Sequence, residues 1–250
     1  MTDFLNDWGL TLVTFLPVVG AVLVMALPKG DESLIKGAAL LTSLATAVVG
    51  ILLMVDFNYD DAGSLQYVVD KNWIDVINSR YIMGLDGISL PLMALTLLVV
   101  PLCIIYSWNH LPDPGKPKAF FTLLLILETG MVGTFLAQDL ILFFVFFEVV
   151  LLPMYFMIGV WGGPNRQYAA IKFFLFTLFG SALMLVSFLA LYFLSDVGTF
   201  DIRLLPDAAS GIATTTQLWI FGGMFLGFGI KVPMFPFHTW LPDAHTEAPT

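Results

Sequence analysis

The sequence predicts an all-α polytopic membrane protein, and two features of its composition support this fold class. Of its 250 residues, 58% are hydrophobic and only 12% are charged, with a mean hydropathy of +0.90. Soluble domains carry about 25% charged residues. A membrane helix needs about 20 mainly apolar residues, because the hydrocarbon layer is about 30 Å thick. Long uncharged or nearly uncharged segments recur along the whole chain, so a soluble globular protein is excluded.

Seven such segments define the expected transmembrane helices. Four of them contain no Asp, Glu, Lys or Arg: residues 9–27, 37–55, 87–109 and 208–230. The other three carry one charge each: residues 119–138 with Glu128, 140–165 with Glu148, and 167–195 with Lys172. Lys231 follows the seventh segment, with Pro233 and Pro236 close behind. Because proline removes a backbone donor and clashes with the preceding turn, we expect the seventh helix to be broken there.

The connections predict a hairpin and an orientation. Residues 57–84 form the longest polar connection and alternate weakly around Tyr67, which predicts a small extracytoplasmic hairpin. The acidic Asp3 and Asp7 do not resemble the start of a signal peptide. With the N-terminus outside, five basic residues lie in inward loops and three in outward loops. Positive charge is retained on the cytoplasmic side, so we expect an extracytoplasmic N-terminus. We interpret the net charge of −9 as solvated loop surface, and expect a lipid bilayer and no nucleic acid as partner.

Charges inside apolar segments are the strongest functional signal. An ionisable group at the bilayer centre costs about 2.5–3.5 kcal/mol, so it persists when it is paired or hydrated. Glu148 lies roughly 13 Å into its helix by helical rise, and Lys172 about 9 Å into the next helix, where it could face Glu148. Lys231 stands at the break, where freed backbone groups can line a hydrated ion site. We predict that Glu148 and Lys231 form a pair that alternates between ionic and neutral forms.

Each of these residues also has a plainer interpretation. Glu148 and Lys231 can form a purely structural pair, and Lys172 can extend to the membrane interface. Glu128 has no obvious basic partner, so we expect a protonated acid hydrogen-bonded to a neighbouring helix. His238 and His245 follow the break and are candidates for a proton relay, although histidines near an interface are more often merely solvated.

Cofactor and metal binding by this chain is not expected. A single cysteine, Cys103, cannot build a disulfide framework or a thiolate cluster. The three histidines, His110, His238 and His245, form no obvious pair for haem ligation.

Two long motifs carry a resemblance to a known family. The first runs from Glu148 through Pro153 and Trp161 to Lys172 and Ser181, and the second from Lys231 and Pro233 through His238 and His245 to Pro249. A shorter motif, Gly84-Leu85-Asp86-Gly87-Ile88-Ser89, fits the same family. The whole chain resembles the antiporter-like membrane subunits of proton-pumping NADH:quinone oxidoreductase, respiratory complex I, and within them chain M, also called subunit 4.

The resemblance implies the N-terminal half of an inverted-repeat fold, with about seven helices and the start of an eighth. Residues 1–110 would hold three N-terminal helices, and residues 119–250 the first repeat, so we expect the sequence to be cut from a larger protein. In that family the residues matching Glu148 and Lys231 form the charge pair of the first half-channel. Glu128 matches no requirement known to us.

The same resemblance implies a proton-translocating subunit of an enzyme complex in the bacterial inner membrane. NADH, FMN, iron–sulfur clusters and quinone would then be bound by partner subunits, and two related antiporter-like chains would be among the neighbours. A multisubunit cation/proton antiporter is the alternative, because its membrane chains share the charged-helix plan. A passive scaffold, in which the charges only fix helix packing, is a third possibility.

Overall fold

The computed structural model of the protein describes residues 4–195 and 197–249, which form two compact units. The first unit holds residues 4–70 and 82–137, and the second holds residues 71–81 and the described residues from 138 onward. Among the described residues, six helical segments are long and apolar enough to cross a membrane: Leu5–Ala26, Glu32–Asp56, Ser89–Ser107, Pro117–Leu136, Leu140–Trp161 and Arg166–Leu194. The prediction of an all-α polytopic membrane protein is therefore confirmed.

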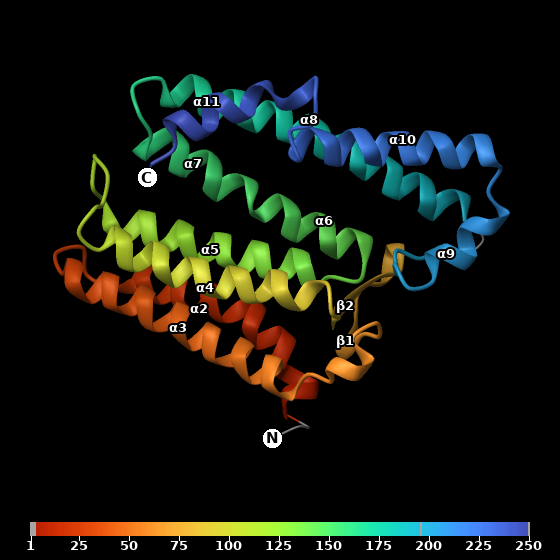
Figure 1. The fold of residues 1–250 in the computed structure, drawn as a ribbon, viewed down its shortest axis with the longest axis horizontal. Helices are drawn as coiled ribbons and strands as arrows, with labels where there is room; N and C mark the ends of the chain where they lie inside the picture. The colour runs from red at the N-terminus through yellow and green to blue at the C-terminus, as the bar shows by residue number, and fades with distance from the viewer. Residues whose placement is uncertain (1–3, 196, 250) are drawn as a thin grey trace. The chain divides into compact units, whose positions relative to one another are not determined.

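The first unit is a bundle of four helices. They are α2 (Leu10–Ala26), α3 (Glu32–Asp56), α4 (Ser89–Ser107) and α5 (Pro117–Leu136). Helix α5 packs against the other three, and α3 packs against both α2 and α4 (Figure 1). Small residues permit this close packing: a Cβ added to Gly20 would lie 2.2 Å from the side chain of Thr42, and one added to Gly50 would lie 2.1 Å from that of Leu97. The bundle core is thus closed by interlocking side chains.

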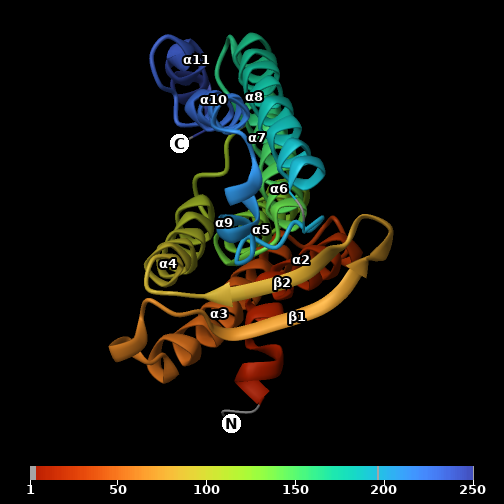
Figure 2. The same ribbon diagram turned by 90° about the vertical axis from the view of Figure 1, so that its right-hand side faces the viewer.

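A two-stranded hairpin lies between α3 and α4, as the sequence predicts. Strand β1 (Gln66–Ile74) pairs with β2 (Ser79–Leu85), and Figure 2 shows the two strands as curved arrows side by side. The chain reverses through a 3₁₀ turn, Asp75–Ile77, and through Asn78, whose φ of 48° is left-handed. Asparagine tolerates this conformation better than most residues. The extracytoplasmic location of the hairpin stays a prediction.

The second unit contains the remaining helices. They are α6 (Leu140–Val149), α7 (Leu151–Trp161), α8 (Arg166–Leu194), the short α9 (Leu205–Ala208), α10 (Thr214–Lys231) and α11 (Trp240–Glu247). Helix α8 packs against α6, α7, α10 and α11, so it is the central element of this unit. Asp139 begins α6 by accepting hydrogen bonds from the backbone N–H groups of Ile141 and Leu142. Its carboxylate also accepts from Ser79 and Arg80, which fixes the hairpin tip to this helix.

The structure differs from the sequence expectations at two helices. The expected fifth helix, 140–165, is interrupted at Val150, because Pro153 has no N–H for the carbonyl of Val149 and its ring crowds that carbonyl. The seventh helix begins at Thr214 instead of residue 208, after α9 and a 3₁₀ turn. It is not among the six candidate spans, since four polar residues open it.

The division into packed units does not follow the expected domains. Helix α5 lies in the first unit with α2, α3 and α4. The expected start of a repeat at residue 119, inside α5, concerns internal symmetry and stays a prediction.

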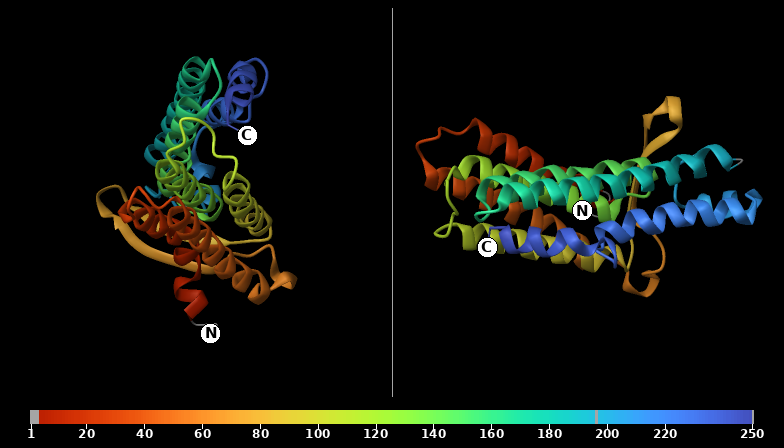
Figure 3. Two further views of the ribbon diagram at one scale, coloured as in Figure 1. Left: turned by 90° about the vertical axis from the view of Figure 1, so that its left-hand side faces the viewer. Right: turned by 90° about the horizontal axis from the view of Figure 1, so that it is seen from above.

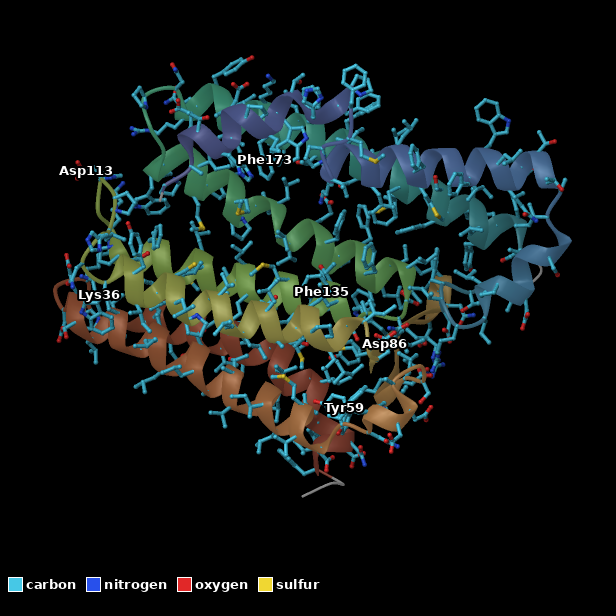
Figure 4. The ribbon with its side chains drawn as sticks, in the orientation of Figure 1. Lys36, Tyr59, Asp86, Asp113, Phe135 and Phe173 are labelled. Atoms are coloured by element: carbon cyan, nitrogen blue, oxygen red, sulfur yellow. The ribbon has the colours of Figure 1, made fainter. Side chains whose placement is uncertain are left out.

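Asp86, which is labelled in Figure 4, stabilises the start of α4, and this contribution depends on pH. Its Oδ1 accepts hydrogen bonds from Ser89 N at 2.8 Å, Ser89 Oγ at 2.8 Å and Ile88 N at 3.1 Å. Burial alone raises the pKa of this carboxyl, but the bonds from Ser89 and Ile88 outweigh it and hold the pKa below the ordinary value of 3.8. The stabilisation is therefore complete above the ordinary pKa and is lost as the pH falls through the lower, folded-state pKa.

We expect Asp86→Ala to lower the free energy of unfolding by about 1 kcal/mol at neutral pH, as loss of a helix cap does. Thermal unfolding at neutral and acidic pH checks this, with Asp60→Ala, a change at an exposed aspartate of the same connection, as control. The difference between the Asp86 variant and the wild type should shrink in acid. An undiminished difference below the ordinary pKa would contradict the assignment.

Candidate functional site

Glu148 and Lys231 form an ion pair inside the second unit. Glu148 is the second-to-last residue of α6, two residues before the interruption at Val150, and Lys231 is the last residue of α10. The Nζ of Lys231 is 3.1 Å from Oε1 of Glu148. Their side chains are 15% and 20% exposed, respectively. The pairing predicted from the sequence is present.

Further groups surround both charges of the pair. The ammonium of Lys231 also donates to the backbone carbonyl of Phe147 at 3.3 Å, and it lies 3.6 Å from the centroid of the Phe147 ring. An aromatic face attracts a cation, so Phe147 stabilises the protonated lysine. On the other side, the hydroxyl of Ser181 on α8 donates to Oε1 of Glu148 and lies 2.9 Å from the carbonyl oxygen of Thr177. A hydroxyl has one proton, so Ser181 can serve only one of these acceptors at a time.

The structure contains the predicted helix break beside Lys231, and the carbonyl groups of Gly229 and Ile230 at this break accept hydrogen bonds. Pro233 cannot donate to the carbonyl of Gly229, and the N–H of Met234 takes its place at 2.8 Å. The carbonyl of Ile230 accepts from the indole Nε1–H of Trp240 at 2.8 Å. Figure 3 (right) follows the blue chain from α10 through this break into α11. The break therefore places Lys231 at a helix end whose backbone is held in place.

We expect Trp240→Phe to destabilise the break. Trp240 is 6% exposed, and its indole N–H donates to the carbonyl of the buried Ile230. Phenylalanine has no such donor, so the carbonyl would be left without a partner. This loss should lower the free energy of unfolding by about 1–3 kcal/mol. The phenyl ring can keep the packing against Phe173 on α8. The matched control is Trp219→Phe on α10, where the side chain is 78% exposed. Thermal unfolding should separate the two variants, and equal melting temperatures would refute the role of this hydrogen bond.

Lys172 does not pair with Glu148, and this sequence expectation was wrong. Its Nζ donates to Oδ2 of Asp243 at 2.7 Å, which joins α8 to α11. It also lies 5.6 Å from the ring centroid of Tyr168. After the break, α11 packs against α8, and this packing brings Asp243 to Lys172. Glu148 is already paired with Lys231. Lys172 is 21% exposed, so it belongs to the attachment of α11 and not to the central pair.

The other candidate residues are not members of this ion pair. His238 is in the 3₁₀ turn Phe237–Thr239, where its ring centroid is 5.6 Å from that of Phe235 and its Nδ1 is buried without a hydrogen-bond partner. His245 is exposed on α11. Glu128 belongs to the first unit, where Ser43 on α3 donates to its Oε1 at 3.1 Å. The expected hydrogen bond to a neighbouring helix is therefore confirmed, whereas a relay through the histidines stays a prediction.

The roles of several residues of the site were not predicted from the sequence. Ser181, Phe147 and Trp240 acquire their roles only from partners that are distant in the chain. Pro153 was a usable signal for the interruption beside Glu148. In the part of the chain that the structure describes, no group of three or more His, Cys, Asp or Glu is placed to hold a metal ion.

The sequence relationships agree with the fold and the paired charges. Residues 14–134 match the amino-terminal family of NADH-ubiquinone oxidoreductase chain 4. Residues 137–250 match the family described as NADH:quinone oxidoreductase/Mrp antiporter, TM. The fold and the site thus define an antiporter-like, polytopic membrane subunit. Residues 137–250 thus belong to the NADH:quinone oxidoreductase/Mrp antiporter family and residues 14–134 to the amino-terminal family of chain 4, as the sequence motifs indicate.

Individual relatives support the same assignment. NADH-quinone oxidoreductase subunit M of Rhodobacter capsulatus is 40% identical in an alignment 256 positions long, which covers 96% of this chain and 48% of the relative. A chain of respiratory complex I from Thermus thermophilus superimposes with a TM-score of 0.83 at 29% identity, covering 96% of this chain and 47% of the other. A chain of the Mrp complex from Dietzia sp. shares the fold, with a TM-score of 0.81 at 19% identity over 96% of this chain and 25% of the other. The chain spans about half the length of the relatives that it matches.

Proposed function

We propose that this chain is part of a proton-translocating membrane subunit of an NADH:quinone oxidoreductase. The observation that carries the proposal is the Glu148–Lys231 ion pair, which is placed between an interruption of one helix and the broken end of another. Family membership supports the choice of complex. Quinone reduction elsewhere in the complex would shift the balance between the ionic and the neutral form of the pair. This shift would drive proton transfer through the subunit.

The chemistry of the pair is a single proton transfer. When a proton moves from Nζ of Lys231 to Oε1 of Glu148, an N–H bond breaks and an O–H bond forms, and both groups become neutral. The Phe147 ring and carbonyl favour the ammonium form, whereas the Ser181 hydroxyl favours the carboxylate. Withdrawal of either neighbour would shift the pair toward its neutral form. Ser181 has an alternative acceptor in the Thr177 carbonyl, so it can release Glu148 without losing a hydrogen bond.

The energy needed to move one proton across the membrane potential is comparable to the energy of breaking the ion pair. Moving one charge across 100 mV takes about 2.3 kcal/mol. Removing one partner of a buried ion pair costs about 3–5 kcal/mol, and the partial exposure of these side chains reduces that figure. Switching one such pair is therefore of the right size to be coupled to translocation of one proton.

The remaining parts of the proposal concern the surroundings of the chain. NADH, FMN, iron–sulfur clusters and quinone would be bound by partner subunits, and two related antiporter-like chains would be among the membrane neighbours. The distribution of Lys and Arg in the loops supports an extracytoplasmic N-terminus in a bacterial inner membrane. Lys172 would fix α11, and His238 and His245 would extend the proton path beyond the break.

Proton uptake into vesicles tests the proposal against an antiporter. The full-length subunit in its assembled complex is reconstituted with a pH-sensitive dye. Addition of NADH and a quinone should acidify one side of the membrane, and a sodium gradient without NADH should not. Proton exchange driven by sodium alone would contradict the redox-driven pump and would favour a cation/proton antiporter.

A further inference from the structure

A second buried acid, Glu128, belongs to the first unit, whereas the proposed proton-transfer pair belongs to the second. Glu128 is the twelfth of the 20 residues of α5, so it lies about 16 Å from the start of the helix, near the middle of its length. Its side chain has 0% exposure. Helices α2, α3 and α4 all pack against α5. The carboxyl group is therefore surrounded by protein at a depth where hydrocarbon is expected outside.

The hydrogen bonding of Glu128 suits a neutral acid better than a carboxylate. The Ser43 hydroxyl donates to Oε1 at 3.1 Å, whereas Oε2 is buried and has no hydrogen-bond partner. A carboxylate has about four acceptor sites on two oxygens, and one neutral donor leaves most of them unsatisfied. Burying an ionised carboxylate with so little compensation is so costly that such a group takes up a proton instead.

The charged groups of the packed helices are too far away to act as counter-ions. Helices α2 and α4 contain no Asp, Glu, Lys or Arg. On α3 the charges stand at the ends, and the basic one, Lys36, is seven residues from Ser43, about 10 Å along the axis. On α5 itself, Lys118 is ten residues from Glu128, about 15 Å away along the axis, and it donates to the carbonyl of Leu27. The other titratable groups on these elements are Glu32, Asp56, Cys103 and Tyr106.

We propose that Glu128 is a second proton-binding site, which holds its proton on Oε2 at neutral pH while Oε1 accepts the hydrogen bond from Ser43. In this state the acid joins α3 to α5 without placing a charge in the membrane. The site belongs to the first unit and the Glu148–Lys231 pair to the second, so the two sites share no residue.

Infrared spectroscopy of the assembled complex tests this site. A protonated carboxylic acid has a carbonyl stretching band that a carboxylate lacks. At neutral pH, the wild-type spectrum minus that of Glu128→Gln should contain this band. Ser43→Ala should move the band to higher frequency, because the carbonyl oxygen loses its donor. Glu148→Gln, a change of the other acid, should leave this band in place.

The result that would overturn the proposal is a difference spectrum with carboxylate bands and no carbonyl band. If Glu128→Gln prevents assembly, the comparison of wild type with Ser43→Ala decides: a displaced acid band supports the proposal and its absence overturns it. Because neither comparison requires proton pumping, failure of this site and failure of the proposed function give different results.

Discussion

Replacing Lys231 by Met should reduce NADH-driven proton translocation at least tenfold while the complex still assembles. The change removes the ammonium that lies 3.1 Å from Glu148, so the pair can no longer pass a proton. A rise of about 1.4 kcal/mol in the rate-limiting barrier already slows the reaction tenfold. Glu148→Gln should have a similar effect, because the amide keeps the shape of the side chain but cannot take up the proton. Protons translocated per NADH oxidised is the quantity to measure.

The matched control for this experiment is Lys71→Met. Lys71 is an exposed lysine of the same unit, so the substitution is chemically identical but takes place in the hairpin. We expect normal pumping from this variant. Normal pumping from an assembled Lys231→Met or Glu148→Gln complex would remove the pair from the mechanism and leave a structural role for it.

Gly227→Ala should have the second largest effect, because it separates the helices that carry the site. A Cβ at Gly227 would lie 2.7 Å from the carbonyl oxygen of Gly180 and 2.9 Å from Cβ of Met184. Real Cβ atoms do not approach backbone oxygen so closely, so α8 and α10 must move apart. Gly180 precedes Ser181, and Gly227 lies one turn before Lys231. The substitution should therefore lower stability by about 1–3 kcal/mol and also weaken pumping.

Gly222→Ala, on the same helix, is the control for that effect. An added Cβ at this position meets nothing within 4 Å. Since alanine is about 0.5–1 kcal/mol more favourable than glycine in a helix, this variant should be neutral or slightly more stable. Thermal unfolding and pumping of both variants are the measurements. If Gly227→Ala were as stable and as active as Gly222→Ala, the claim that stability and pumping require the close approach of α8 and α10 would be contradicted.

The sequence was sufficient to predict most of the helical segments and the Glu148–Lys231 pair. Hydrocarbon requires long apolar runs and disfavours isolated ions, so the runs identify helices and their rare charges identify candidate partners. The break after Lys231 was predictable for a local reason, the missing N–H of Pro233. The hairpin was predictable from its polar, alternating strands.

What the sequence could not supply was the arrangement of residues distant in the chain. Lys172 pairs with Asp243, 71 residues further on, because α11 returns to α8 after the break. Nothing in the local pattern fixes that return. The same holds for Ser181 and Trp240, whose roles depend on Glu148 and Ile230. Packing of α5 with the first unit likewise depends on how side chains fit together, and a hydropathy profile contains no information about this fit.

A double-substitution cycle of pumping tests the central claim most directly. The proton-to-electron ratio is measured for the wild type, Glu148→Gln, Lys231→Met and the double variant, all as assembled complexes. If the two residues act as one proton-transferring unit, the double variant should pump no worse than either single variant, because each change alone already disables the unit. If the losses instead multiply, the two side chains act independently, and the account given for this pair is contradicted.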